Sequence, residues 1–145
     1  MNYIINTRTL YVMFDGKNTI INEYGTEIVF NGNLVNDILE NSCIYYGSTL
    51  KGKMIGSKNL INSRYKLPII INDRKNLIFF KITNNKEIIW FNFNKIKDYK
   101  KNNLFITIYF INNYSKNFMI SWSIFNNQIL KSSRLLMVYL VHGNN

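Results

Sequence analysis

The sequence is short of the residues that carry most metal and redox chemistry. Among 145 residues it has one cysteine, Cys43, and one histidine, His142. A single cysteine excludes an internal disulfide and leaves no set of thiolates for a structural zinc site. The eight carboxylates are scattered through segments that are typical of turns and helix surfaces. We therefore expect a protein that is not an enzyme and that holds no metal or cofactor.

Proline, alanine and long apolar runs are also scarce. Pro68 is the only proline, alanine is absent, and the longest wholly apolar run covers the seven residues 135–141. A membrane-spanning helix needs about 20 apolar residues, so we expect none and no membrane partner. The chain shows no linker, no repeat and no secretion signal. These absences predict a single domain over residues 1–145, located in the cytoplasm.

What is present is apolar and aromatic surface. Hydrophobic residues make up 47% of the chain and aromatic residues 15%, which is enough to bury a core at this length. Asparagine and lysine are abundant, but both have codons that begin with two A bases. A/T-rich coding DNA therefore explains their numbers without reference to structure.

The charge is unevenly distributed along the chain. The net charge is +10, yet residues 1–45 hold two basic residues against five acidic ones, a sum of −3. Residues 46–145 hold 16 basic residues against three acidic ones, a sum of +13. Codon bias predicts no such asymmetry. A region this basic favours a polyanionic partner, which is either nucleic acid or an anionic membrane surface.

Short apolar runs between turn-forming residues predict β-strands. Each run is rich in Ile, Phe, Tyr or Val, and the connections between many of them are short, so we expect antiparallel pairing. The predicted strands are residues 10–14, 27–30, 67–71, 77–82, 88–93, 104–111 and 118–123.

Two other segments have the spacing of amphipathic helices. Leu34 and Ile38 are four residues apart in residues 34–46, and Ile129, Leu136 and Leu140 follow a seven- and eleven-residue spacing in residues 126–141. Together with the strands they predict an α+β fold, mainly an antiparallel sheet with two amphipathic helices.

The most basic segment is residues 46–66, which contain no acidic residue. Ammonium and guanidinium groups neutralise phosphates, and glycine turns let the backbone approach a ligand closely. We interpret the segment as a phosphate-binding loop shaped by Gly47, Ser48, Gly52 and Gly56. The alternative is a solvated loop, and charge alone does not decide between them. The candidate contacts are Lys51, Lys53, Lys58, Arg64 and Lys66.

Residues 47–53 also satisfy the G-x-x-x-x-G-K pattern of nucleotide hydrolases. Met54 follows where a Ser or Thr hydroxyl should hold magnesium, and the segment before Gly47 is predicted to be helix where the motif requires a strand. We therefore do not expect nucleotide hydrolysis. Trp90 and Trp122 would suit base stacking in a single-strand binder, but both lie in or beside apolar runs that favour a place in the core.

Several blocks occur in an order that is similar to one family. The first block, SCIYYGS at residues 42–48, is followed by Gly-Lys at 52–53 and by Gly56. Later blocks are Pro-Ile at 68–69, Asn76 with IFF at 78–80, Ile-Ser at 120–121 and FNNQI at 125–129. Over about residues 36–135 these blocks resemble the ComK family of competence transcription factors.

The resemblance implies a cytoplasmic, nucleoid-associated activator of competence (DNA-uptake) genes. It implies binding to paired A/T-rich boxes of double-stranded DNA, mainly through the minor groove, as a homo-oligomer that works with RNA polymerase. The minor groove of A-tracts is narrow and concentrates negative potential, which attracts lysine and arginine. Under this hypothesis the five basic residues of 46–66 contact DNA, and Lys131 and Arg134 on the second helix are weaker candidates.

The resemblance also implies a C-terminal tail that serves adaptor-mediated proteolysis, and residues 136–145 do not match it. We therefore expect a ComK-like domain without that tail, and no proteolytic adaptor as a partner. Two alternatives stay open. One is a shortened interaction module that joins full-length relatives without activating transcription, and the other is a single-stranded nucleic-acid binder.

Overall fold

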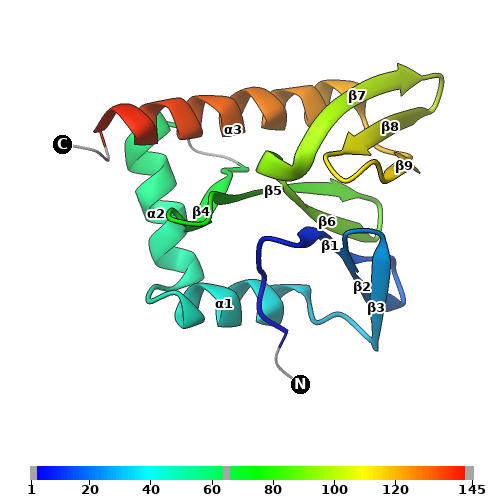
Figure 1. Ribbon diagram of the computed structural model, residues 1–145, viewed down its shortest axis with the longest axis horizontal. Coiled ribbons are helices and arrows are strands. Elements are labelled where there is room, and N and C mark those ends of the chain that lie inside the picture. Colours follow the sequence, from blue (N-terminus) through cyan, green and yellow to red (C-terminus); the bar gives the residue numbers. More distant parts are fainter. Residues whose placement is uncertain (1–2, 64–65, 143–145) are drawn as a thin grey trace.

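Antiparallel strands and three helices build the part of the chain that the computed structural model describes, residues 3–63 and 66–142 (Figure 1). Within these residues no helix combines the length and apolar character needed to cross a lipid bilayer. The strands are β1 (Thr9–Phe14), β2 (Asn18–Glu23), β3 (Thr26–Asn31), β4 (Ile69–Asn72), β5 (Leu77–Asn84), β6 (Glu87–Asn92), β7 (Ile96–Asn102), β8 (Phe105–Phe110) and β9 (Ser115–Phe118). The helices are α1 (Val35–Tyr45), α2 (Leu50–Ile61) and α3 (Trp122–His142), and a short 3₁₀ turn, Phe93–Lys95, precedes β7.

The strands form two sheets. In the larger sheet the order is β3-β2-β1-β6-β5-β4, and every neighbouring pair is antiparallel. The smaller sheet has the order β7-β8-β9 and is also antiparallel. The two hairpin series of the larger sheet, β1 to β3 and β4 to β6, join where β1 pairs with β6. The predictions of an α+β fold and of antiparallel pairing are confirmed.

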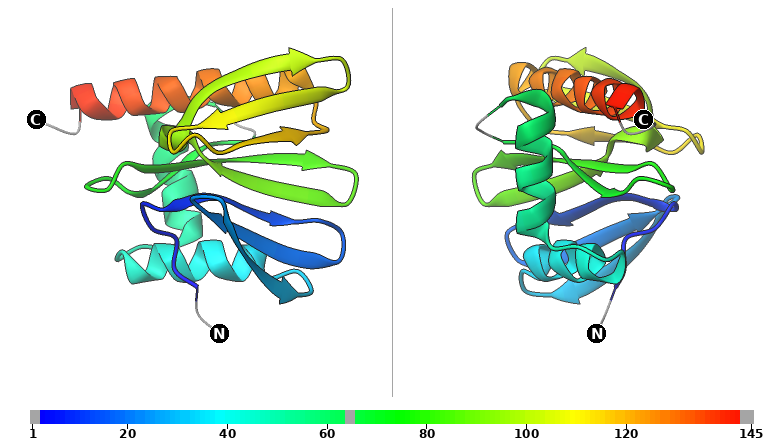
Figure 2. Two further views of the ribbon diagram at one scale, coloured as in Figure 1. Left: turned by 45° about the vertical axis from the view of Figure 1, so that its right-hand side comes forward. Right: turned by 90° about the vertical axis from the view of Figure 1, so that its left-hand side faces the viewer.

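Each face of the larger sheet is covered by different elements. On one face α1 buries Val35, Ile38 and Leu39 in a cluster that also contains Trp90. On the other face the smaller sheet and the start of α3 pack over β1, β5 and β6. Figure 2 shows the resulting layers, with α2 standing across the edge of the molecule between α1 and α3. This arrangement places α2 beside the edge strand β4, with Ile61 against Ile70 in a small cluster.

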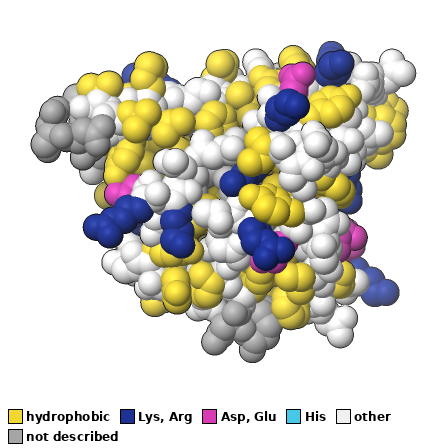
Figure 3. Space-filling view, in the orientation of Figure 1, with side chains coloured by type: hydrophobic (Ala, Val, Ile, Leu, Met, Phe, Trp, Pro, Cys, Tyr) yellow, Lys and Arg dark blue, Asp and Glu magenta, His cyan; other side chains and the backbone are white. Residues whose placement is uncertain are grey.

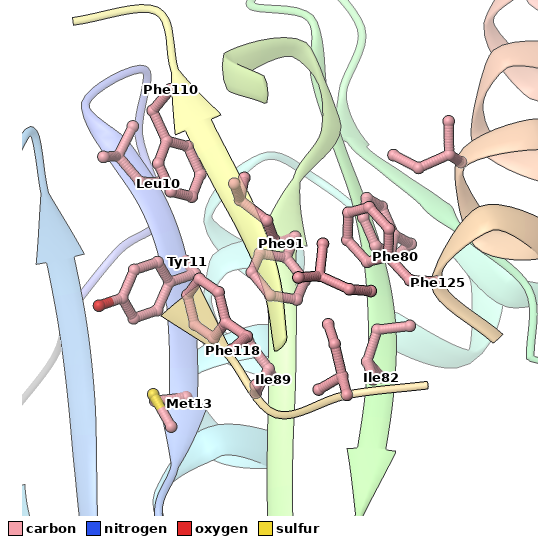
Figure 4. Close-up of a cluster of buried hydrophobic side chains, with 14 residues drawn as sticks. Leu10, Tyr11, Met13, Phe80, Ile82, Ile89, Phe91, Phe110, Phe118 and Phe125 are labelled. Atoms are coloured by element: carbon pink, nitrogen blue, oxygen red, sulfur yellow. The ribbon is translucent and has the colours of Figure 1, made fainter. Parts of the chain in front are cut away.

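Aromatic rings fill the core between the two sheets. Phe91 lies between Tyr11 and Phe118 on one side and Phe80 and Phe125 on the other (Figure 4). Its ring centroid is 5.0 Å from that of Phe118 and 5.5 Å from that of Phe80. The contact with Phe125, at 5.8 Å, connects α3 to the larger sheet. Edge-to-face contacts of this kind add stability beyond the burial of apolar area.

Two predicted helices are confirmed, but the predicted number of helices is wrong because α2 is a third helix among the described residues. The strand predicted at residues 118–123 is also wrong, since β9 ends at Phe118 and α3 begins at Trp122. Strands β2, β7 and β9 were not predicted, and only Phe118 of β9 falls within a predicted run. Their sequences, NTIINE, IKDYKKN and SKNF, contain too many polar residues for an apolar-run criterion. On α3 the predicted inward position Leu140 is 52% exposed.

Asparagine occupies many of the left-handed turn positions. Five asparagines have φ between 51° and 68°, a region that most non-glycine residues avoid and that asparagine tolerates. Four of them stand in connections between strands, and the fifth ends α2. They are Asn62, Asn76, Asn85, Asn103 and Asn113.

Candidate nucleic-acid interface

The basic segment contains a helix, so its interpretation as a glycine loop is wrong. Helix α2 begins after Thr49, whose Oγ1 accepts a hydrogen bond from the Gly52 N–H at 3.0 Å. The Glu40 carboxylate accepts a second one from the Leu50 N–H at 2.9 Å. At the other end Asn62 adopts a left-handed conformation and donates its N–H to the Lys58 carbonyl. These caps offset the cost of two interior glycines, about 0.5–1 kcal/mol each.

The four residues predicted to shape a loop take two different places. Gly47 and Ser48 lie in the turn after α1, where Gly47 has φ of +92° and its N–H bonds to the Ile44 carbonyl at 2.9 Å. Gly52 and Gly56 lie inside α2. A Cβ at Gly52 would lie 3.0 Å from the capping oxygen of Thr49, whereas a Cβ at Gly56 would have no neighbour within 4 Å.

Two glycine-to-alanine substitutions test this correction by the sign of their effects. Gly47→Ala places a Cβ at a left-handed position and should lower the free energy of unfolding by roughly 1–2 kcal/mol. Gly56→Ala enters a helix without a clash and should raise it by about 0.5–1 kcal/mol. Urea denaturation measures both. A destabilising Gly56→Ala would contradict a helix over Leu50–Ile61.

The start of α2 does not form a phosphate cradle, although it overlaps the G-x-x-x-x-G-K pattern. The N–H groups of Leu50 and Gly52 are already bonded to Glu40 and to Thr49. The Glu40 carboxylate would repel a phosphate at this position. The described geometry therefore agrees with the sequence argument against nucleotide hydrolysis.

One face of α2 forms a wall of a cavity of about 330 Å³, which we call the lysine cavity. Its lining comes from α2, from the segment before β4, and from β5 and β6. None of its described lining residues is acidic. In the view of Figure 3, Lys and Arg side chains are spread over the visible face of the molecule and do not form one continuous patch. The lining residues are Lys51, Met54, Ile55, Lys58, Lys66, Leu67, Lys81 and Trp90.

Trp90 is one of the lining residues of this cavity, although only 1% of its surface is exposed. Lys81 pairs with Trp90 across β5 and β6, and its Nζ lies 5.7 Å from the centre of the indole ring. The indole Nε1 has no hydrogen-bond acceptor among the described residues. The cavity thus combines an apolar wall with four ammonium groups. Positive charge beside a low-dielectric surface attracts anions strongly.

Helix α3 positions one lysine of this cavity. Lys66 has φ of +50°, and its carbonyl accepts a hydrogen bond from Gln128 Nε2 at 2.8 Å. Gln128 is 2% exposed, so the donor side of this bond is buried, whereas Lys66 itself is exposed. It holds the segment before β4 against α3 and places Lys66 at the cavity.

The predicted basic contacts do not all lie together. Lys51, Lys58 and Lys66 line the lysine cavity. Lys53 lines a separate cavity of about 280 Å³ that also contains Asp73 and Tyr139.

The remaining predicted contacts lie elsewhere. Lys131 is half-buried and Arg134 is exposed on α3, and neither is among the residues that line these two cavities. Arg64 lies outside the described residues.

The Tyr139 hydroxyl donates a hydrogen bond to the Asp73 carboxylate. This bond lowers the pKa of Asp73 and raises that of Tyr139. It attaches the last turns of α3 to the connection between β4 and β5.

Two residues of the candidate site were missed by the sequence argument. Lys81 interrupts an apolar run, LIFFKIT, and a single charge in a buried strand was the available signal. Gln128 carries no charge, so a count of basic residues could not find it. Among the described residues no three His, Cys, Asp or Glu side chains come together to hold a metal ion.

The comparisons with known proteins give one match. A family model described as ComK protein matches residues 1–140 of the 145-residue chain. No match was found among curated proteins or among solved structures. Because the family model covers almost the whole chain, the protein belongs to the ComK family. This is a family of competence-related transcription factors and not a family of enzymes.

Proposed function

We propose that this protein activates competence genes by binding paired A/T-rich boxes of double-stranded DNA, mainly through the minor groove. The observation that carries the proposal is the lysine cavity, with four lysines and no acidic residue among its described lining. We further propose that it acts in the cytoplasm at the nucleoid, as a homo-oligomer, with RNA polymerase as a partner. Family membership supports transcription regulation in general.

The spacing of lysines on α2 suits a backbone that carries repeated charges. Lys51 and Lys58 are seven residues apart, which is about 10 Å along a helix. At this distance the two ammonium groups reach different phosphates. Such contacts fix the position of a protein on a duplex, and the strong potential of a narrow A-tract groove favours them.

The positions of the two tryptophans argue against single-strand binding as the main activity. Trp90 is 1% exposed. Trp122 is half-buried, and its ring centroid lies 5.5 Å from that of Tyr99. Stacking an unpaired base requires an accessible ring face. The core position of Trp90 therefore favours duplex DNA as the ligand.

Salt-dependent binding tests the proposal. Each neutralised phosphate contributes about −0.9 to the slope of log affinity against log salt, so four lysines give roughly −3.6. We expect a duplex with two spaced A-tracts to bind more tightly than a G·C-rich duplex, and a minor-groove drug to compete.

Fluorescence anisotropy on both duplexes and on the separated strands measures this. Equal binding of the two duplexes contradicts the minor-groove proposal. Tighter binding of the separated strands favours the single-strand alternative.

A further inference from the structure

The hairpin of β7 and β8 ends at the upper right of the molecule in Figure 1, on the side away from α1 and α2. Residues 100–105 at its end are all exposed, whereas Ile106 and Ile108 nearer its base are buried in the core. Leu104 at the tip is 74% exposed, and the adjacent Phe105 is 39% exposed. An apolar pair therefore stands at the end of this hairpin.

Leu104 is an unusual residue for this position. The register pairs Asn102 with Phe105, so the connection consists of Asn103 and Leu104 alone. Asn103 supplies the left-handed conformation, with φ of +52°. Tight turns favour Gly, Asn, Asp, Ser and Pro, and the connection between β5 and β6 also begins with an asparagine, Asn85, but continues with the polar Lys86. Leu104 is neither a favoured turn residue nor part of the buried core.

Hydrogen bonds between side chains brace the outer face of the hairpin. Asn102 Nδ2 donates to Thr107 Oγ1 at 2.7 Å, and Thr107 Oγ1 donates to Asn117 Oδ1 at 2.7 Å. These two hydrogen bonds connect side chains of β7, β8 and β9. A braced element loses less conformational entropy on binding than a flexible loop does. The tip of the hairpin is therefore preorganised for binding.

The charge around the tip complements a polyanion. Lys100 and Lys101 are exposed on β7 beside the turn, and the sequence has no acidic residue after Asp98. The Lys100 Nζ lies 5.8 Å from the centre of the Tyr109 ring, which directs it along the outer face. A basic hairpin with an apolar tip matches proteins that insert leucine or a similar wedge between base steps from the minor groove.

We propose that Leu104 acts as such a wedge, inserting at an A/T step of the minor groove while Lys100 and Lys101 contact the flanking phosphates. This inference rests on the proposed function because it requires duplex DNA as the ligand. It assigns the protein a second DNA contact, on a different sheet from the lysine cavity.

A duplex with 2-aminopurine at successive positions of the A-tract tests the wedge, because the fluorescence of this base rises when it is unstacked. Wild-type protein should raise the signal at one step. Leu104→Ser should abolish the rise and weaken binding by roughly tenfold, with the salt slope unchanged. Leu104→Met should keep the rise. Thermal unfolding of Leu104→Ser should match that of the wild type, because the side chain is exposed.

Leu130→Ser is the matched control, since Leu130 is a leucine that is 58% exposed on α3 and not on the hairpin. Leu130→Ser should leave the rise in 2-aminopurine fluorescence intact. Loss of the rise in this variant would contradict the assignment of the wedge to the hairpin. Duplex binding without a rise at any position overturns the wedge alone. A wild-type protein that binds no duplex overturns the proposed function, and the wedge with it.

Discussion

Reversing two charges of the lysine cavity, Lys51→Glu with Lys58→Glu, should weaken binding to an A-tract duplex by more than about 100-fold. Each charged contact contributes about 1.5 kcal/mol or more, so two lost contacts give about 3 kcal/mol. The slope of log affinity against log salt should become less steep by about 1.8. Fluorescence anisotropy across a salt series measures both quantities.

The matched control is Lys75→Glu with Lys86→Glu. These two exposed lysines stand in the connections β4–β5 and β5–β6, and the double reversal changes the net charge by the same amount. It should weaken binding far less. Equal losses in the two variants would mean that overall charge, and not the lysine cavity, determines affinity. Lys51 and Lys58 are themselves exposed, so both variants should unfold at temperatures close to that of the wild type.

Phe91→Ala should lower the free energy of unfolding by about 3–5 kcal/mol, because it removes the ring at the centre of the aromatic core. Phe91 is 0% exposed and lies within 6.1 Å of four other ring centroids. A domain of this size is stable by about 5–15 kcal/mol, so the loss is a large part of the total. Urea denaturation measures it.

Phe105→Ala serves as the control for this prediction. Phe105 is 39% exposed at the hairpin tip, and its truncation should change the free energy of unfolding by less than about 1 kcal/mol. Similar losses for the two variants would contradict the position of Phe91 at the centre of the core.

The sequence predicted those parts of the fold in which local pattern and tertiary packing agree. Apolar runs such as residues 77–82 and 88–93 became β5 and β6, because both of their faces are buried. Strand β7 escaped prediction because most of its residues are exposed and polar. Strand β7 is stabilised by its antiparallel pairing with β8, which the composition of β7 alone does not predict.

The candidate site was harder to predict for a different reason. The count of basic residues identified Lys51, Lys58 and Lys66 as candidates. It could not show that Lys53, on the same helix as Lys51 and Lys58, lines a different cavity. The lysines point to different cavities because residues 50–61 are helical, and the two glycines in this segment favoured the prediction of a loop. Lys81 and Gln128 come from distant parts of the chain, so only the folded arrangement brings them to Lys66.

The asparagines at left-handed turns give the composition of this chain a structural meaning. Glycine codons begin with two G bases and are rare in A/T-rich DNA, and the chain has only seven glycines. Asparagine has A/T-rich codons and is the residue, after glycine, that best tolerates the left-handed region. Five turn or cap positions use it. Mutational drift toward A and T, and natural selection for closed hairpins, therefore favour the same amino acid.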